Sequence, residues 1–130
     1  MVSELCCEKE LVPRGDELVP QIILGIVYVA GPYRAEDEHK RKKNIDHADE
    51  KGIELGDKGW APFIPHKMYK DWGGRFSDRQ ILDWCLEFLG NCDLLYVLKG
   101  WETSEGTKEE IERAKELEIS IIYEKNDETY

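Results

Sequence analysis

Apolar residues along the chain gather in four runs, and charged segments separate these runs. The first is nearly continuous in β-branched and aromatic residues and stops at Gly31-Pro32, which predicts a strand buried on both faces near the centre of a parallel sheet. The expected strands cover residues 22–30, 60–64, 94–98 and 119–123. The charged segments place their apolar residues at helical intervals, and they predict helices over residues 36–55, 77–89 and 107–117.

The alternation of strand and helix indicates the fold class. It predicts a single α/β domain over residues 21–123, with an open, mostly parallel sheet, right-handed crossovers and helices in layers on both faces. We expect residues 1–20 to form an extended or loosely attached arm and residues 124–130 to form a polar tail. Ligands of such sheets bind outside the carboxyl ends of the strands. The loops after Ala30, Ile64 and Leu98 are therefore the places to look for a site.

Composition narrows the classes of partner. The chain has 130 residues, and 28 acidic against 18 basic side chains give a net charge of −10, which opposes binding to a nucleic acid polymer or to an anionic membrane. No apolar run is long enough for a membrane span, so we expect a cytoplasmic protein. Cys85 and Cys92 lie in apolar surroundings without metal-ligand spacing, which favours buried free thiols over zinc ligands. The residues call for neither a metal nor an organic cofactor.

Glu110 is the most unusual residue of the last predicted helix. At about 100° per residue, Ile111, Ala114 and Leu117 define the core-facing direction of that helix, and Glu110 lies within roughly 40° of it. Glu109 points about 140° away, toward solvent. A carboxylate turned inward is costly unless it is bonded or used in chemistry. Glu110 is thus either a catalytic candidate or a structural carboxylate bonded to backbone or to an arginine.

The segment before that helix has the composition of an anion site. Residues 103–107 offer backbone N–H groups at the positive end of a helix dipole, hydroxyl side chains that include Ser104, and Gly106, which lets a ligand approach the backbone. Ordinary capping of the helix by Ser104 or Thr107 explains the same residues.

Two other loops carry candidates for ligand binding. Gly31, Tyr33 and Arg34 follow the central strand, where an aromatic ring could stack on a base or sugar and a guanidinium could bind a phosphate. A turn with a surface arginine is the simpler alternative. His66 follows the second strand, and a histidine held by local hydrogen bonds is favoured there over a catalytic base.

Three segments together resemble the nucleoside 2-deoxyribosyltransferase superfamily. They are YVAGPYR at residues 28–34, Pro65-His66, and CDLLYVLKGWETSEGTKEE at residues 92–110. The most specific element is Ser-x-Gly-x-x-x-Glu, and the resemblance spans about residues 22–123. It is closest to a small branch of uncharacterised bacterial and phage proteins and extends to the 2′-deoxynucleoside 5′-phosphate N-hydrolases. It implies a three-layer, flavodoxin-like or Rossmann-like fold, assembled as a homodimer or larger homo-oligomer with active sites near the subunit contacts.

The resemblance also implies an activity. The family glutamate falls on Glu110, which would attack the anomeric carbon of the sugar and form a glycosyl-enzyme ester, the logic of retaining glycosidases. Ser104 matches a residue that helps to bind a 5′-phosphate in the hydrolases, and this favours a nucleotide over a free nucleoside. Gly31 and Arg34 match the phosphate-side loop, where Pro32 replaces a serine and removes one backbone donor.

An acid from the preceding helix belongs to the same family pattern. Its expected position falls on Cys85, and the nearest acids are Asp83 and Glu87, of which we choose Asp83 as the second catalytic candidate. Both acids lie opposite the apolar arc of that helix, so plain exposure to solvent is the alternative. The apolar arc of that helix spans roughly 200°, more than one core face needs, and a subunit contact would cover the surplus.

The leading interpretation is therefore an N-glycosidase or deoxyribosyltransferase-like enzyme that acts on a nucleoside or a nucleoside 5′-monophosphate. The main alternative is a nucleotide-binding or sensing module with the same pocket and no chemistry, which Pro32 and the displaced acid favour. An oligomeric scaffold without a ligand is the third, and the inward Glu110 argues against it.

Overall fold

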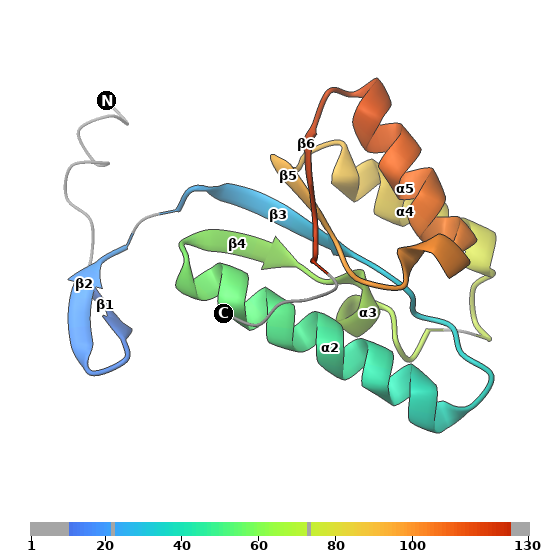
Figure 1. Ribbon diagram of the computed structural model, residues 1–130, viewed down its shortest axis with the longest axis horizontal. Helices are drawn as coiled ribbons and strands as arrows, with labels where there is room; N and C mark the ends of the chain where they lie inside the picture. The colour runs from blue at the N-terminus through green and yellow to red at the C-terminus, as the bar shows by residue number, and fades with distance from the viewer. Residues whose placement is uncertain (1–10, 22, 73, 126–130) are drawn as a thin grey trace.

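The computed structural model describes residues 11–21, 23–72 and 74–125 (Figure 1). A small hairpin is followed by an α/β domain with a four-stranded parallel sheet. The strands of the sheet are β3 (Gly25–Ala30), β4 (Trp60–Phe63), β5 (Leu94–Val97) and β6 (Ser120–Tyr123). The helices are α2 (Glu38–Asp57), α3 (Pro65–Met68), α4 (Asp78–Leu89) and α5 (Glu105–Glu116), and a 3-10 turn, η1, covers Trp101–Thr103.

The sheet has the strand order β4-β3-β5-β6, and its three strand pairs are all parallel. The chain leaves β3 for β4 in one direction and then crosses back past β3 to β5. Crossovers of one hand therefore place α2 on one face of the sheet and α4 and α5 side by side on the other (Figure 1). The predicted open α/β sheet with helices on both faces is confirmed. The reversal of direction between β3 and β5 is the place where such sheets bind ligands.

Alternate residues of β3 supply the two halves of the core. Val27 and Val29 pack toward α2, whereas Tyr28 and Ala30 pack toward α4 and α5. All four side chains are at most 1% exposed. The prediction that this strand is buried on both faces is thus correct for residues 27–30.

The first strand is shorter than its apolar run. It begins at Gly25 because Gly25 pairs with Trp60, the first residue of β4. Ile23 and Leu24 lie before the paired segment and are 59% and 57% exposed. Burial thus follows the length of the neighbouring strand, which the apolar run alone does not reveal.

The helix starts are set by side-chain caps. Ser77 caps α4 and forms the predicted capping box with Gln80. α5 begins at Glu105, two residues before the expected start, because the hydroxyl of Ser104 accepts a hydrogen bond from the backbone N–H of Thr107. The expected loop from residue 65 also begins as the single helical turn α3.

Residues 11–20 form an antiparallel hairpin of β1 (Leu11–Arg14) and β2 (Glu17–Pro20). Its strands pair with each other, and the hairpin extends away from the parallel sheet (Figure 1). Leu11 and Leu18 are 58% and 65% exposed. The predicted arm therefore has regular structure over these ten residues; its first ten residues lie outside the described part of the chain.

Part of the broad apolar arc of α4 is covered by the chain itself. The ring of Trp84 lies 4.9–6.3 Å from those of Tyr69, Trp72 and Phe76, which come from the segment between β4 and α4. Phe88 stacks on Phe63 of β4 at 4.8 Å. The surplus of the arc thus meets intramolecular aromatic contacts, and the expected subunit contact stays a prediction.

Glu124 extends the fold past the expected start of the polar tail. Its side chain is buried against α2, where it meets His47 Nε2 at 2.9 Å and Lys51 Nζ at 3.4 Å, and it accepts a hydrogen bond from the backbone N–H of Lys99. Its own N–H donates to the carbonyl of Val97.

No helix in the described ranges combines the length and apolar character needed to cross a bilayer.

Candidate active site

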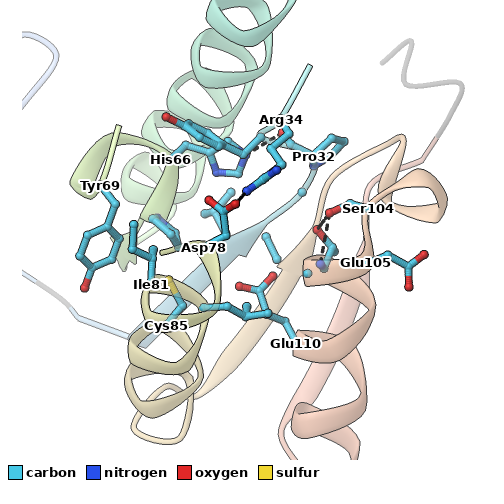
Figure 2. A pocket seen from close by; sticks show the side chains of 18 of the residues that line it. Pro32, Arg34, His66, Tyr69, Asp78, Ile81, Cys85, Ser104, Glu105 and Glu110 are labelled. Carbon is cyan, nitrogen blue, oxygen red and sulfur yellow. Dashed lines mark hydrogen bonds and ion pairs between the residues drawn. The ribbon is translucent and has the colours of Figure 1, made fainter. Parts of the chain in front are cut away.

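A cavity of about 610 Å³ opens at the carboxyl ends of β3 and β5, between the loop after β3 and the start of α5 (Figure 2). This volume lies within the range of small-molecule sites. Of the eight site residues predicted from sequence, seven line the cavity. They are Gly31, Tyr33, Arg34, His66, Ser104, Gly106 and Glu110.

Glu110 belongs to α5, and its side chain points toward α4 in the wall of the cavity (Figure 2). The residue is 7% exposed. The hydroxyl of Tyr28 donates a hydrogen bond to its Oε2. Tyr28 is fully buried in the central strand, so a rigid element holds this carboxylate. The inward direction predicted from the helical wheel is confirmed. The partner is a tyrosine, however, and not the backbone group or arginine expected for a purely structural carboxylate.

Burial dominates the electrostatics of this pair. Loss of solvent raises the pKa of Glu110 to about 7, although the hydrogen bond from Tyr28 acts in the opposite direction. Burial and the neighbouring Glu110 together raise the pKa of Tyr28 well above its ordinary value. Tyr28 therefore remains a donor, while Glu110 exchanges its proton near neutral pH. A buried carboxyl group that titrates near neutrality is typical of catalytic sites.

The start of α5 brings polar donors to the same cavity. Ser104 Oγ accepts hydrogen bonds from the backbone N–H of Thr107 at 3.2 Å and from its hydroxyl at 2.9 Å. Both lone pairs of Ser104 Oγ are thus engaged, and its own proton is left to donate to a ligand. The N–H groups of the first helical residues, Glu105 and Gly106, have no intrahelical acceptor.

The two glycines of the site have different physical reasons to be glycine. A Cβ on Gly31 would lie 2.7 Å from the side chain of Leu98, so the packing of this loop against Leu98, directly after β5, excludes a larger residue. A Cβ on Gly106 would meet Leu82 at 3.8 Å, an ordinary contact. The fold therefore requires Gly31, whereas only an incoming ligand would require Gly106.

Arg34 forms an ion pair with Asp78, the first residue of α4 (Figure 2). The pair joins the loop after β3 to the start of α4 at the mouth of the cavity, and its side chains are 67% and 73% exposed. Arg34 thus lies where the sequence placed it, with a carboxylate already bound.

His66 lies in α3, is 4% exposed and lines the cavity. Its Nε2 lies 2.9 Å from the carbonyl oxygen of Pro32, and because a carbonyl only accepts, Nε2 carries the proton. Burial lowers the pKa of His66, so the ring is neutral and Nδ1 holds a lone pair, which has no hydrogen-bond partner among the described residues. The hydrogen bond of His66 therefore joins it to a loop 34 residues away in the chain, and not to its own loop as expected from the sequence. The ring of Tyr33 packs edge-on against His66, and its hydroxyl donates to the carbonyl of Lys70.

Asp83 does not join these residues. Its side chain is 60% exposed and lies outside the cavity, where Arg79 holds it at 2.7 Å. The same guanidinium forms two hydrogen bonds with Glu109 of α5. Asp83 has this position because it projects from the solvent side of α4, opposite its apolar arc. The residues of α4 that line the cavity are instead Asp78 at its start and Cys85 in its buried middle.

Sequence reasoning missed Tyr28 and Asp78. Tyr28 stands in a run of aliphatic residues, and a tyrosine hydroxyl inside a buried strand needs a partner, which is a usable signal. Asp78 is an acid in the first turn of a helix, where acids are favourable in general, so no pattern in the sequence distinguishes it from an ordinary helix start.

Among the described residues, no group of three or more His, Cys, Asp or Glu side chains is arranged to hold a metal ion.

Comparison with known proteins places the chain in a family. No curated protein matches it significantly. The profile of the domain of unknown function DUF4406 matches residues 26–123, about three quarters of the chain. This match runs from the central strand through β6 and so contains the whole cavity. The chain therefore belongs to the DUF4406 family.

Proposed function

We propose that this protein cleaves the N-glycosidic bond of a nucleoside or nucleoside 5′-monophosphate, with Glu110 as the nucleophile. The observation that carries this proposal is the buried Glu110 carboxyl group in the wall of a ligand-sized cavity, held by the hydroxyl of Tyr28. The resemblance to the nucleoside 2-deoxyribosyltransferase superfamily supports it, because the superfamily glutamate falls on this same residue.

The fold and the position of the cavity also support the proposal. In terms of the sheet alone, the order β4-β3-β5-β6 corresponds to the first four strands of the flavodoxin-like order 2-1-3-4-5. That fold binds ligands at the switch between its first and third strands, here β3 and β5. We assign the domain to this three-layer class on that correspondence.

The chemistry follows from the two oxygens of Glu110. Oε2 accepts the hydrogen bond from Tyr28, which leaves Oε1 to attack the anomeric carbon. As the C–O bond forms, the C–N bond breaks and its electron pair leaves with the base, through a transition state with oxocarbenium character. Water then attacks the same carbon, the ester C–O bond breaks and its electron pair returns to Glu110; the proton that the water loses balances the one that the departed base takes up. A second base that attacks in place of water completes a transfer. Tyr28 orients the carboxylate throughout.

A second candidate is a nucleotide-binding module without turnover. It is favoured by Cys85, which lines the cavity at the position where the superfamily resemblance leads us to expect an acid. Burial raises the pKa of the Cys85 thiol to about 11, so this group is a poor proton donor to a departing base.

The decisive experiment incubates the protein with 2′-deoxynucleosides, ribonucleosides and their 5′-monophosphates, and measures free base by chromatography. We expect base release by the native protein and at least a 10³-fold loss in Glu110→Gln. Glu116→Gln is the matched control, because Glu116 is an exposed acid of the same helix that pairs with Arg113. Equal rates in native protein and Glu110→Gln would contradict the proposal, and saturable binding without base release would favour the second candidate.

A further inference from the structure

The mouth of the cavity holds a charge pair that matters for the choice of substrate. Arg34 is a natural partner for a phosphate, because its guanidinium presents a fork of donors. In the structure this fork is bound to the carboxylate of Asp78. An internal carboxylate thus occupies the position that the phosphate of a nucleotide would take.

The other cation that lines the described part of the cavity is also engaged. Arg79 forms two hydrogen bonds with Glu109, at 2.9 and 2.8 Å, and two with Asp83, at 3.0 and 2.7 Å. The acids that line the cavity are Asp78, Glu105 and Glu110. Three acids and two paired arginines do not form a favourable environment for a phosphate dianion.

The remaining polar groups suit uncharged partners. Ser104 offers one hydroxyl proton, and Pro32 has no backbone N–H to give. The first turn of α5 carries Glu105, whose side chain points away from Glu110 and pairs with Lys108 at 3.3 Å (Figure 2). These hydroxyl and backbone N–H donors can bind the hydroxyl groups of a sugar. The N–H groups at the start of α5 can also bind an anion, so the carboxylates around the cavity decide between the two.

We propose that Asp78 is a specificity-determining residue, which makes the cavity select an uncharged nucleoside over its 5′-monophosphate by occupying Arg34. This inference rests on the proposed function and names its substrate class. It differs from the expectation drawn from Ser104, which favoured a nucleotide. A phosphate that approaches Arg34 must either displace Asp78, which breaks the ion pair, or share the guanidinium with it, which brings two like charges close together.

The size of the effect follows from simple electrostatics. Two like charges about 4 Å apart repel each other, more weakly in water than near a protein surface. Because both side chains of the pair are exposed, we expect the weaker repulsion, which gives about a tenfold preference for the nucleoside. High salt should reduce this preference.

The test uses Asp78→Asn, which keeps the shape of the side chain and removes its charge. Affinities of native protein and variant are measured by calorimetry for 2′-deoxynucleosides, their 5′-monophosphates and inorganic phosphate. We expect the native protein to bind nucleosides more tightly, and Asp78→Asn to move the ratio about tenfold toward the monophosphates and to gain binding of inorganic phosphate. A second change, Arg34→Gln, should abolish both gains. Glu116→Gln, which breaks an exposed acid–arginine pair away from the cavity, should leave the ratio unchanged.

The outcomes separate this inference from the proposed function. Nucleoside preference that depends on Asp78, without any base release, would support the inference and refute the enzymatic activity. Base release with monophosphates bound as tightly as nucleosides, or with a ratio that Asp78→Asn does not move, would overturn the inference and leave the activity intact. Failure of every variant to bind a nucleoside, a monophosphate or phosphate would overturn both.

Discussion

Replacement of Glu110 by Gln should make the protein more stable at alkaline pH and should abolish the proposed base release. Gln has the shape of Glu and its carbonyl oxygen can accept the hydrogen bond from Tyr28, but it carries no charge to desolvate. Burial raises the pKa of Glu110 from 4.5 in the unfolded chain to about 7 in the folded protein. At 1.36 kcal/mol per pH unit, this difference corresponds to about 3 kcal/mol.

The sign of the effect follows from proton linkage. Because the folded pKa lies above the unfolded one, the folded protein binds the proton of Glu110 more tightly, and the stabilisation from this proton is complete below pH 4.5. It is lost as pH rises, and above about pH 7 the folded protein must hold a buried carboxylate. The native protein and Glu110→Gln should therefore have similar stabilities at pH 5, and the variant should be more stable by about 3 kcal/mol at pH 8.5.

Urea unfolding at matched protein concentration, followed by circular dichroism between pH 5 and 8.5, measures this difference. Glu116→Gln serves as the control, because its side chain is 71% exposed and its replacement should give a difference that does not change with pH. All other titrating groups are common to the compared proteins and cancel. A difference between native protein and Glu110→Gln that stays constant over this range, or that falls with pH, would refute the reasoning.

Three further predictions concern the same site. If the protein acts as proposed, kcat/KM should rise with pH to a plateau above about pH 7, because Glu110 must be ionised to attack. A profile that is flat from pH 5 to 9 would contradict this role. Tyr28→Phe should move the rising part of that profile to higher pH, because it removes a hydrogen bond that lowers the pKa of Glu110. At pH 8 the same change should cost about 1–3 kcal/mol of unfolding free energy. A profile that does not move would show that Tyr28 does not orient Glu110. Gly31→Ala should destabilise the protein by about 1–3 kcal/mol, because the new Cβ overlaps with Leu98. Gly106→Ala should keep or slightly raise the melting temperature and lower kcat/KM about tenfold or more. Equal losses of stability in the two variants would contradict the distinction between them.

Much of the candidate site could be predicted because it lies in loops that parallel strands bring together. The loops after parallel strands all lie at the carboxyl edge of the sheet, so Gly31 and Ser104 were expected at the same edge, and the structure makes their strands, β3 and β5, direct neighbours. Glu110 could be placed because helical periodicity fixes the direction of a side chain relative to the core. These inferences need only local spacing and the general topology of α/β sheets.

Other features depend on distances between segments that no periodicity encodes. The bond between Tyr28 and Glu110 joins residues 82 positions apart, and the pair of Arg34 and Asp78 joins a loop to the start of a different helix. Asp83 was chosen as one of the two acids nearest to the expected position, Cys85, although it lies opposite the apolar arc of α4, and the structure places it in solvent.

The amino-acid sequence by itself determined the class of the fold, the order of its strands and helices along the chain, and the inward direction of Glu110, because apolar periodicity and capping act between residues close in the chain. Only the tertiary structure decided which tyrosine holds Glu110, which carboxylate occupies Arg34 and where β3 begins. Each of these depends on a partner from a distant segment, and burial raises the pKa of Glu110 to about 7 only once that partner and its surroundings exclude water.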